Sequence, residues 1–150
     1  MPANNYTREI LIANTPRAAY EALTTGFDNW WTGGSSPATA VGDILTFRFE
    51  PTYWTMRVTR LIPDETIEFE CIDAHHTHEG LPASILKEWE GTKLKWKIQQ
   101  QGDKTKISFV HEGLVPALNC YGICERGWDH YFVNGLKDYL DSGDQSIKDV

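Results

Sequence analysis

Hydrophobic and polar residues alternate through the middle of the chain, between residues 43 and 112. Five segments carry apolar side chains at every second position, which is the pattern of a β-strand with one buried face. Turn signals such as Pro63-Asp64 and Gly102-Asp103 separate neighbouring segments, so we predict an antiparallel meander in which residues 75–86 form the one long connection. The alternating apolar positions are Leu45, Phe47, Phe49, Trp54, Met56, Val58, Ile67, Phe69, Cys71, Leu94, Trp96, Ile98, Ile107 and Phe109.

Helical spacing flanks this region on both sides. A short β-prone run precedes Thr15-Pro16, which is typical of an N-cap with proline at the first helical position. We predict a helix from there, a break at Gly26 and a second short helical turn through Trp31. From about residue 119 to residue 140, apolar residues again fall on one helical face and predict a long amphipathic helix. Its apolar positions are Tyr121, Cys124, Trp128, Phe132, Leu136 and Tyr139.

This order of elements predicts an α+β fold in which a curved antiparallel sheet wraps around the long C-terminal helix, with two short helices after the first strand. A chain of 150 residues has a common size for one domain, so we assign residues 1–150 to a single domain that ends in a polar tail, residues 141–150. A curved sheet closed by one helix tends to leave an apolar pocket between the two. We therefore expect a cavity lined by inward strand residues and by the apolar face of the helix.

The composition of the chain limits which partners it can bind and in which cellular compartment it is expected. The chain has 14 basic and 21 acidic residues, a net charge of −7, which disfavours binding to nucleic acid or to an anionic membrane. No segment reaches the roughly 18 consecutive apolar residues of a membrane span, and the first residues lack the pattern of a leader. Three cysteines cannot all pair, which favours a reducing compartment. We expect a cytoplasmic protein without membrane insertion.

Four short motifs within this order of elements carry a resemblance to a known family. They are Trp30-Trp31 after the first helix, His111-Glu112-Gly113-Leu114 at the end of the last strand, Gly127-Trp128 in the last helix, and Leu136-Lys137-Asp138-Tyr139-Leu140 further along it. The chain resembles the SRPBCC superfamily, and within it the branch named after the activator of the heat-shock-protein-90 ATPase. The resemblance implies the helix-grip fold of the birch-pollen allergen and of START lipid-transfer domains. This fold hosts lipid carriers, polyketide cyclases, hormone receptors and co-chaperones, so it does not choose one function.

A cavity in such a fold predicts a binding module for a small hydrophobic or amphipathic molecule. Since consecutive helical residues cannot both face inward, one of Trp30 and Trp31 is expected in the core and the other at the cavity mouth. No cofactor is expected, because the chain has no glycine-rich phosphate loop, dinucleotide fingerprint or serine-hydrolase elbow. The residues expected to line the cavity are Trp30, Trp31, Phe47, Trp54, Met56, Phe69, Trp96, His111, Tyr121, Glu125, Trp128 and Phe132.

Two titratable groups are predicted to face this cavity. His111 keeps phase with the buried positions of its strand, and Glu125 lies at the centre of the apolar helix face, one turn before Trp128. A His–Glu hydrogen bond that ties sheet to helix, a polar anchor for a ligand, and the acid–base pair of a cyclase-like enzyme all fit this placement. Because no nucleophile or metal ligand completes a catalytic set, we expect no enzymatic activity. The family branch leaves a chaperone, or a second copy of the chain, open as a partner.

The remaining polar candidates receive structural interpretations. His75, His76 and His78 are metal-ligand types, but their spacing is poor for a site, so we expect a solvated loop and no bound metal. The resemblance offers no motif for this loop. The cysteines are expected to pack as small apolar residues, and the lysines between residues 93 and 106 to form a solvated basic ribbon.

Overall fold

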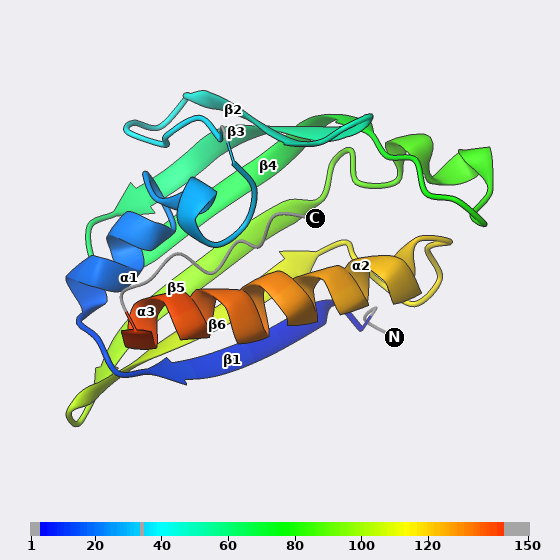
Figure 1. The fold of residues 1–150 in the computed structure, drawn as a ribbon. Helices are drawn as coiled ribbons and strands as arrows, with labels where there is room; N and C mark the ends of the chain where they lie inside the picture. Colours follow the sequence, from blue (N-terminus) through cyan, green and yellow to red (C-terminus); the bar gives the residue numbers. More distant parts are fainter. Residues whose placement is uncertain (1–3, 34, 143–150) are drawn as a thin grey trace.

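The sheet has six antiparallel strands and curves around the C-terminal helix (Figure 1). This computed structural model describes residues 4–33 and 35–142, so the predicted polar tail lies outside the described residues from residue 143 on. The strands run in the order β1-β6-β5-β4-β3-β2, in which β2 to β6 form the predicted meander and β1 pairs with β6. The α+β prediction is confirmed. The strands are β1 Tyr6–Ile12, β2 Ile44–Phe49, β3 Thr52–Ile62, β4 Thr66–His75, β5 Lys93–Gln101 and β6 Lys104–Glu112.

Alternation decides which strand residues reach the interior. In β5, Leu94 and Trp96 are buried, whereas Lys93 and Lys97 on the opposite face are exposed. Two register shifts interrupt the pairing of β3 with β4. Such bulges bend a strand and increase its twist, so they help to curve the sheet toward the helix.

Two short helices pack near one end of the sheet (Figure 1). Helix α1 spans Pro16–Ala22, and the 3-10 turn η1 spans Phe27–Asn29. Thr15 caps α1, because its hydroxyl accepts a hydrogen bond from the amide of Ala18 at 3.1 Å. After η1, the indole N–H of Trp30 donates to the carbonyl of the last α1 residue at 2.8 Å. The predicted cap, break and second turn are confirmed.

The C-terminal helix is continuous but changes its winding. It consists of α2 (Tyr121–Trp128), the π-helical segment η3 (Asp129–Leu136) and α3 (Lys137–Ser142). A spacing of four residues is slightly more than one α-helical turn of about 3.6 residues and slightly less than one turn of the wider π-helix. A row at this spacing therefore drifts one way around the α-helical segments and the other way around the π-helical segment. The π segment therefore keeps one row of buried residues facing the sheet. This row recurs at every fourth position: Cys120, Cys124, Trp128, Phe132, Leu136 and Leu140.

Polar contacts hold the helix against the edge strand β1. Asp129 accepts hydrogen bonds from the hydroxyl of Tyr6 at 2.7 Å and from Nε of Arg8 at 2.9 Å. Burial, reinforced by the Asp129 carboxylate, raises the pKa of Tyr6, so its hydroxyl stays protonated and donates. One turn before the end of the helix, Lys137 Nζ donates to the carbonyl of Leu11 at 2.7 Å. These partly exposed contacts fix orientation more than they add stability.

The connection between β4 and β5 folds over the start of the last helix. It contains the 3-10 turn η2 (Ala83–Lys87), and the carboxylate of Glu88 accepts hydrogen bonds from the amides of Asn119 and Cys120, each at 3.0 Å. An acceptor at this position satisfies amides that a helix start leaves unpaired. In the described part of the chain, no helix combines the length and the apolar character needed to cross a membrane.

Gly113, directly after β6, offers a test of this packing. Its φ of +101° is one that L residues rarely adopt, and a Cβ there would lie 2.8 Å from Cγ2 of Thr92. We expect Gly113→Ala to lower the free energy of unfolding by about 3 kcal/mol, since backbone strain and the clash add. Urea unfolding followed by circular dichroism measures the loss. The control is Gly102→Ala, where φ is +64° and the added Cβ meets nothing within 4 Å; a cost of about 1 kcal/mol is expected. Equal losses would contradict the steric explanation.

Candidate functional site

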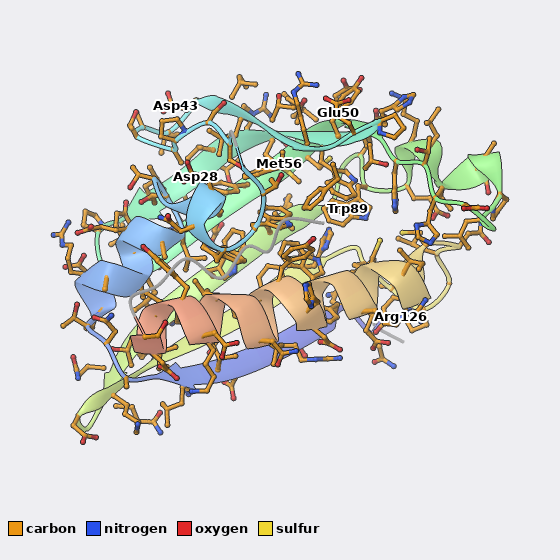
Figure 2. All side chains as sticks on the ribbon, in the orientation of Figure 1. Asp28, Asp43, Glu50, Met56, Trp89 and Arg126 are labelled. Atoms are coloured by element: carbon orange, nitrogen blue, oxygen red, sulfur yellow. The ribbon has the colours of Figure 1, made fainter. Side chains whose placement is uncertain are left out.

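An apolar cavity of about 410 Å³ lies between the sheet and the N-terminal half of the last helix. Its volume is within the range of about 300–1,000 Å³ that is usual for small-molecule sites. Figure 2 shows one of its residues, Trp89, between the sheet and the helix. The lining residues are Trp31, Phe49, Thr52, Trp54, His76, Thr77, His78, Trp89, Ile123, Cys124, Gly127, Trp128 and Tyr131.

Four tryptophans from separate parts of the chain form the main wall of the cavity. Trp54 and Trp89 stack with ring centroids 4.3 Å apart, and Trp31 lies 4.8 Å from Trp128. Trp89 and Trp128 join the two pairs at 6.0 Å. Aromatic pairs of this kind contribute about 0.5–1.5 kcal/mol each beyond burial, so the wall is a stable aromatic surface.

A chain of buried hydrogen bonds lies behind this wall. The indole N–H of Trp128 donates to Nδ1 of His111 at 3.0 Å, which places the imidazole proton on Nε2. His111 Nε2 then donates to Oγ1 of Thr92 at 2.9 Å, and the Thr92 hydroxyl donates to the carbonyl of Trp89 at 2.6 Å. Every polar atom of the His111 ring is thus satisfied within the protein. His111 ties the sheet to the helix, and it does so through Trp128.

The structure disperses the twelve predicted site residues. Trp31, Trp54 and Trp128 lie on the cavity wall, whereas seven others are enclosed in the core and do not reach the cavity. Phe27 of η1 encloses four of them, because its ring lies 5.0 Å from Phe47 and within 6.2 Å of the rings of Trp30, Phe69 and Trp96. The seven enclosed residues are Trp30, Phe47, Met56, Phe69, Trp96, His111 and Phe132. As expected, one of the paired tryptophans is core and the other lies at the cavity.

The predicted pairing of His111 with Glu125 is wrong. The side chain of Glu125 is 35% exposed and lies 3.4 Å from Arg8 of β1, while His111 is fully buried. The row of buried helix residues passes through Cys124, which turns the next residue toward the sheet edge. Tyr121 was also expected at the cavity, but its hydroxyl lies 3.4 Å from the same Glu125 carboxylate, away from the wall.

The expectation of a solvated histidine loop after β4 is also wrong for its central member. His76 is only 4% exposed, packs edge-on against Trp54 at 5.2 Å and donates its backbone N–H to the carbonyl of Leu86 at 3.0 Å. His75, the last residue of β4, and His78 in the loop are less buried. A ring nitrogen of His76 lies within 4.8 Å of the sulfur atoms of Cys120 and Cys124. The three histidines are near neighbours in the sequence, but the fold buries only His76.

All three cysteines are buried free thiols, as expected from their apolar surroundings. Cys124 Sγ accepts a hydrogen bond from the indole N–H of Trp89 at 3.2 Å. The neighbouring Cys124 thiol and burial raise the pKa of Cys120, and burial raises the pKa of Cys71 to about 12. The thiols of Cys120 and Cys71 are therefore protonated at neutral pH in the absence of a further charge.

Two aromatic residues of the cavity escaped the sequence analysis. Trp89 is a single tryptophan between two glutamates, outside any periodic segment, and Tyr131 lies three residues after Trp128. A tryptophan within a polar stretch is unusual, and this alone could have indicated that Trp89 is buried. Tyr131 gave none, because an α-helical period places it at the margin of the apolar face.

A larger hollow of about 960 Å³ lies on the opposite face of the sheet, but its character differs. Charged residues of both signs line it, and Lys95 pairs with Glu112 at 3.0 Å. The lysine ribbon is thus partly neutralised by neighbouring acids, which fits a solvated face. The charged lining residues are Arg8, Glu9, Arg60, Glu65, Glu68, Lys95 and Lys97.

Fold and cavity together define a helix-grip fold with an apolar pocket between the sheet and the last helix. A family model described as activator of Hsp90 ATPase homolog 1-like protein matches residues 13–141. The chain therefore belongs to this family, and the resemblance to the heat-shock-protein-90 ATPase activator branch of the SRPBCC superfamily is confirmed.

Solved structures support the same assignment. The Aha1 dimer from Colwellia psychrerythraea is 28% identical, with a TM-score of 0.75 over 93% of this chain and 98% of that one. DynU16, a putative protein in the dynemicin biosynthetic locus, has a TM-score of 0.75 at 16% identity, over 99% of this chain and 51% of that one. MLL2253 from Mesorhizobium loti has a TM-score of 0.74 at 18% identity, over 94% and 99%. The last two show the fold alone. No curated protein matches the sequence.

The buried imidazole predicts a specific dependence of stability on pH. Burial lowers the pKa of His111 from 6.5 to about 3, so the unfolded chain binds a proton that the folded protein rejects. Stability is therefore full above pH 6.5 and falls as the pH drops toward 3, by about 2 kcal/mol at about pH 5. Urea unfolding at about pH 7 and about pH 5 measures this.

Two variants distinguish the protonation of His111 from that of other groups in the protein. His111→Gln retains an acceptor and a donor but does not titrate, so we expect it to lose most of the difference in unfolding free energy between the two pH values. His130→Gln, at an exposed position of the last helix, should keep the wild-type difference. A His111→Gln variant with the full wild-type pH dependence would contradict the assignment.

Proposed function

We propose that this protein binds a small apolar or amphipathic molecule in the cavity between the sheet and the last helix. The observation that carries the proposal is a space of about 410 Å³ that is lined by four tryptophan rings. Burying a flat apolar molecule against this wall contributes roughly 25 cal/mol per Å² removed from water.

The bound molecule is expected to carry a hydrogen-bond acceptor. Trp54 lines the cavity, and its Nε1 is buried without a hydrogen-bond partner among the described residues. A buried donor left unpaired costs about 1–3 kcal/mol. A ligand oxygen placed against this N–H would remove that cost, which favours an amphipathic molecule over a plain hydrocarbon.

A binding role fits the site better than the cyclase-like alternative. Glu125 faces β1, and the His111 ring is enclosed by its bonds to Trp128 and Thr92. Neither group is placed to exchange a proton with a molecule in the cavity. The proposed role is therefore to hold a ligand rather than to transform it.

Gly127 allows the cavity to be filled without disturbing the core. It lies on the cavity wall in α2, and an added Cβ there would meet nothing within 4 Å. We expect Gly127→Leu to weaken binding of an anilinonaphthalene sulfonate dye by about tenfold or more, because its side chain takes up the cavity volume. Since glycine costs a helix about 0.5–1 kcal/mol, the variant should be at least as stable as the wild type. Fluorescence titration and thermal unfolding measure the two effects.

Gly122→Leu is the matched control, because Gly122 is exposed on the same helix and does not line the cavity. It should bind the dye as the wild type does. Native mass spectrometry of protein purified from its own host should show a bound small molecule in the wild type and in Gly122→Leu, but not in Gly127→Leu. An unchanged dye affinity in Gly127→Leu would place the binding elsewhere and reject the cavity as the site.

The second candidate function is a chaperone-associated role in the cytoplasm. It is supported by membership of a family described by its similarity to an activator of the Hsp90 ATPase. The likeness to an Aha1 dimer over nearly the whole chain also keeps self-association open. Three buried free thiols agree with a reducing compartment. The mixed charges on the outer face of the sheet offer a partner no strongly single-signed surface, so we rank this function second.

The two functions are distinguished by the ATPase rate of heat-shock protein 90. We expect that rate to remain unchanged when the purified protein is added in excess, because the proposed site has the size of a small-molecule pocket. The dye-filled and the empty protein should behave alike. A stimulation of several-fold would favour the chaperone-associated role and reverse the ranking.

A further inference from the structure

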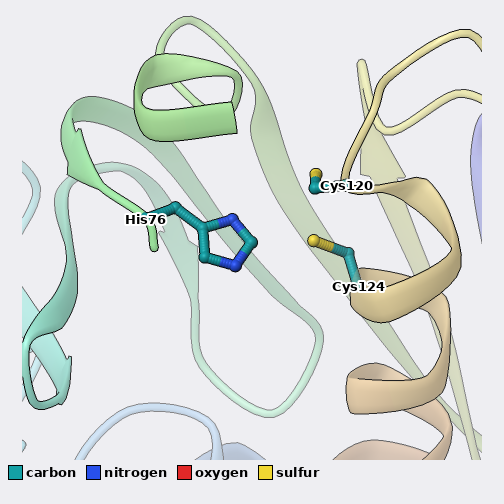
Figure 3. Close-up of side chains that lie close together, drawn as sticks. All are labelled: His76, Cys120 and Cys124. Carbon is teal, nitrogen blue, oxygen red and sulfur yellow. The ribbon is translucent and has the colours of Figure 1, made fainter. Parts of the chain in front are cut away.

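We propose that His76, Cys120 and Cys124 form a binding site for one zinc ion at the edge of the cavity. One ligand atom of each residue lies within 4.8 Å of the other two, and all three side chains are buried (Figure 3). With zinc bonds of about 2.0 Å to nitrogen and about 2.3 Å to sulfur, the ligand atoms of a tetrahedral centre lie roughly 3.5–3.8 Å apart. Zinc binding would draw the three ligand atoms closer together. This site does not depend on the proposed apolar ligand.

His76 supplies an independent observation. The residue is only 4% exposed, and its Nδ1 is buried without a hydrogen-bond partner in the described part of the chain. Figure 3 shows the imidazole ring facing the two sulfur atoms. A buried polar atom is normally paired, so an unpaired imidazole nitrogen beside two thiols is the arrangement expected of a metal site without its ion.

The charges of the three side chains select a divalent ion. Zinc binding would convert both thiols to thiolates, and two thiolates with one neutral imidazole balance a charge of +2. A neutral cluster suits the apolar surroundings, where an unbalanced charge is costly. A monovalent copper ion on the same ligands would leave the site negative. Nitrogen and thiolate ligands are also those that zinc prefers.

Hydrogen bonds from the β4–β5 connection hold each ligand in place. The His76 amide donates to the carbonyl of Leu86, and the Glu88 carboxylate accepts from the Cys120 amide, both at 3.0 Å. Trp89 donates its indole N–H to Cys124 Sγ at 3.2 Å. Donors of this kind stabilise a metal-bound thiolate and orient it. The connection thus carries the supporting groups that a built metal site requires.

The three ligands leave one coordination position open. His76 and Cys124 both line the cavity, so the fourth position faces the space proposed for the ligand. Zinc sites with three protein ligands characteristically bind water or an added donor at the fourth. The structure therefore assigns to this position a water molecule or an oxygen or nitrogen donor from a molecule in the cavity.

Zinc titration of the chelator-treated, reduced protein tests the site. We expect one zinc ion per chain, measured by competition with a chromophoric chelator and by native mass spectrometry. Cobalt in place of zinc should give the intense near-ultraviolet absorption of cobalt–thiolate bonds. Since loss of a supporting group alone costs about 10–100-fold, Cys120→Ser and Cys124→Ser should each weaken zinc binding by roughly 100-fold or more. Cys71→Ser removes the third buried thiol, outside the cluster, and should bind zinc as the wild type does.

His76→Phe guards against a variant that simply fails to fold, because phenylalanine keeps the ring against Trp54. Its circular dichroism spectrum should match that of the wild type, while zinc should no longer raise its unfolding temperature. The proposal is overturned if the folded wild type takes up no zinc at micromolar concentration, or if Cys120→Ser and Cys124→Ser bind zinc as tightly as Cys71→Ser. Uptake of monovalent copper without any uptake of zinc would overturn the assignment of a divalent ion.

Discussion

The last helix lies where it does because a chain of buried hydrogen bonds runs from it into the sheet and on to the β4–β5 connection. Trp128 donates to His111, His111 to Thr92, and Thr92 to the carbonyl of Trp89. Because these hydrogen bonds are buried, a break at any step would leave a polar atom unpaired, so these parts assemble in one arrangement. The cavity wall depends on that arrangement, since Trp89 and Trp128 are members of both.

Small side chains explain why this end of the interior stays open while the other is closed. Phe27 fills the far end with an aromatic cluster. Near the start of the helix, Gly127 and Cys124 present little volume, and Thr52 does the same on the sheet side. Cys124 has a second consequence, because a sulfur in place of a larger apolar group also faces His76. Apolar surface and metal-ligand chemistry therefore meet at one place in the fold.

The winding of the last helix decides which of its side chains reach this place. A row of buried residues at every fourth position would spiral around a regular α-helix, but the π segment returns it to the sheet. An α-helical period, applied from Tyr121 onward, places Glu125 at the centre of the apolar face. The observed winding turns Glu125 to Arg8 instead. Backbone hydrogen bonding, rather than the apolar pattern alone, selects the face.

The sequence by itself determined the strands, the short helices, the family and three of the four cavity tryptophans. Alternation, caps and turn signals lie within a few neighbouring residues, so the chain carries them locally. Only the tertiary structure decided that His111 pairs with Trp128 and not with Glu125, and that His76 meets two cysteines of the last helix. Those partners are distant along the chain, so no pattern of neighbouring residues relates them. They come together only because the sheet curves, the connection after β4 folds inward, and the helix settles in its mixed winding.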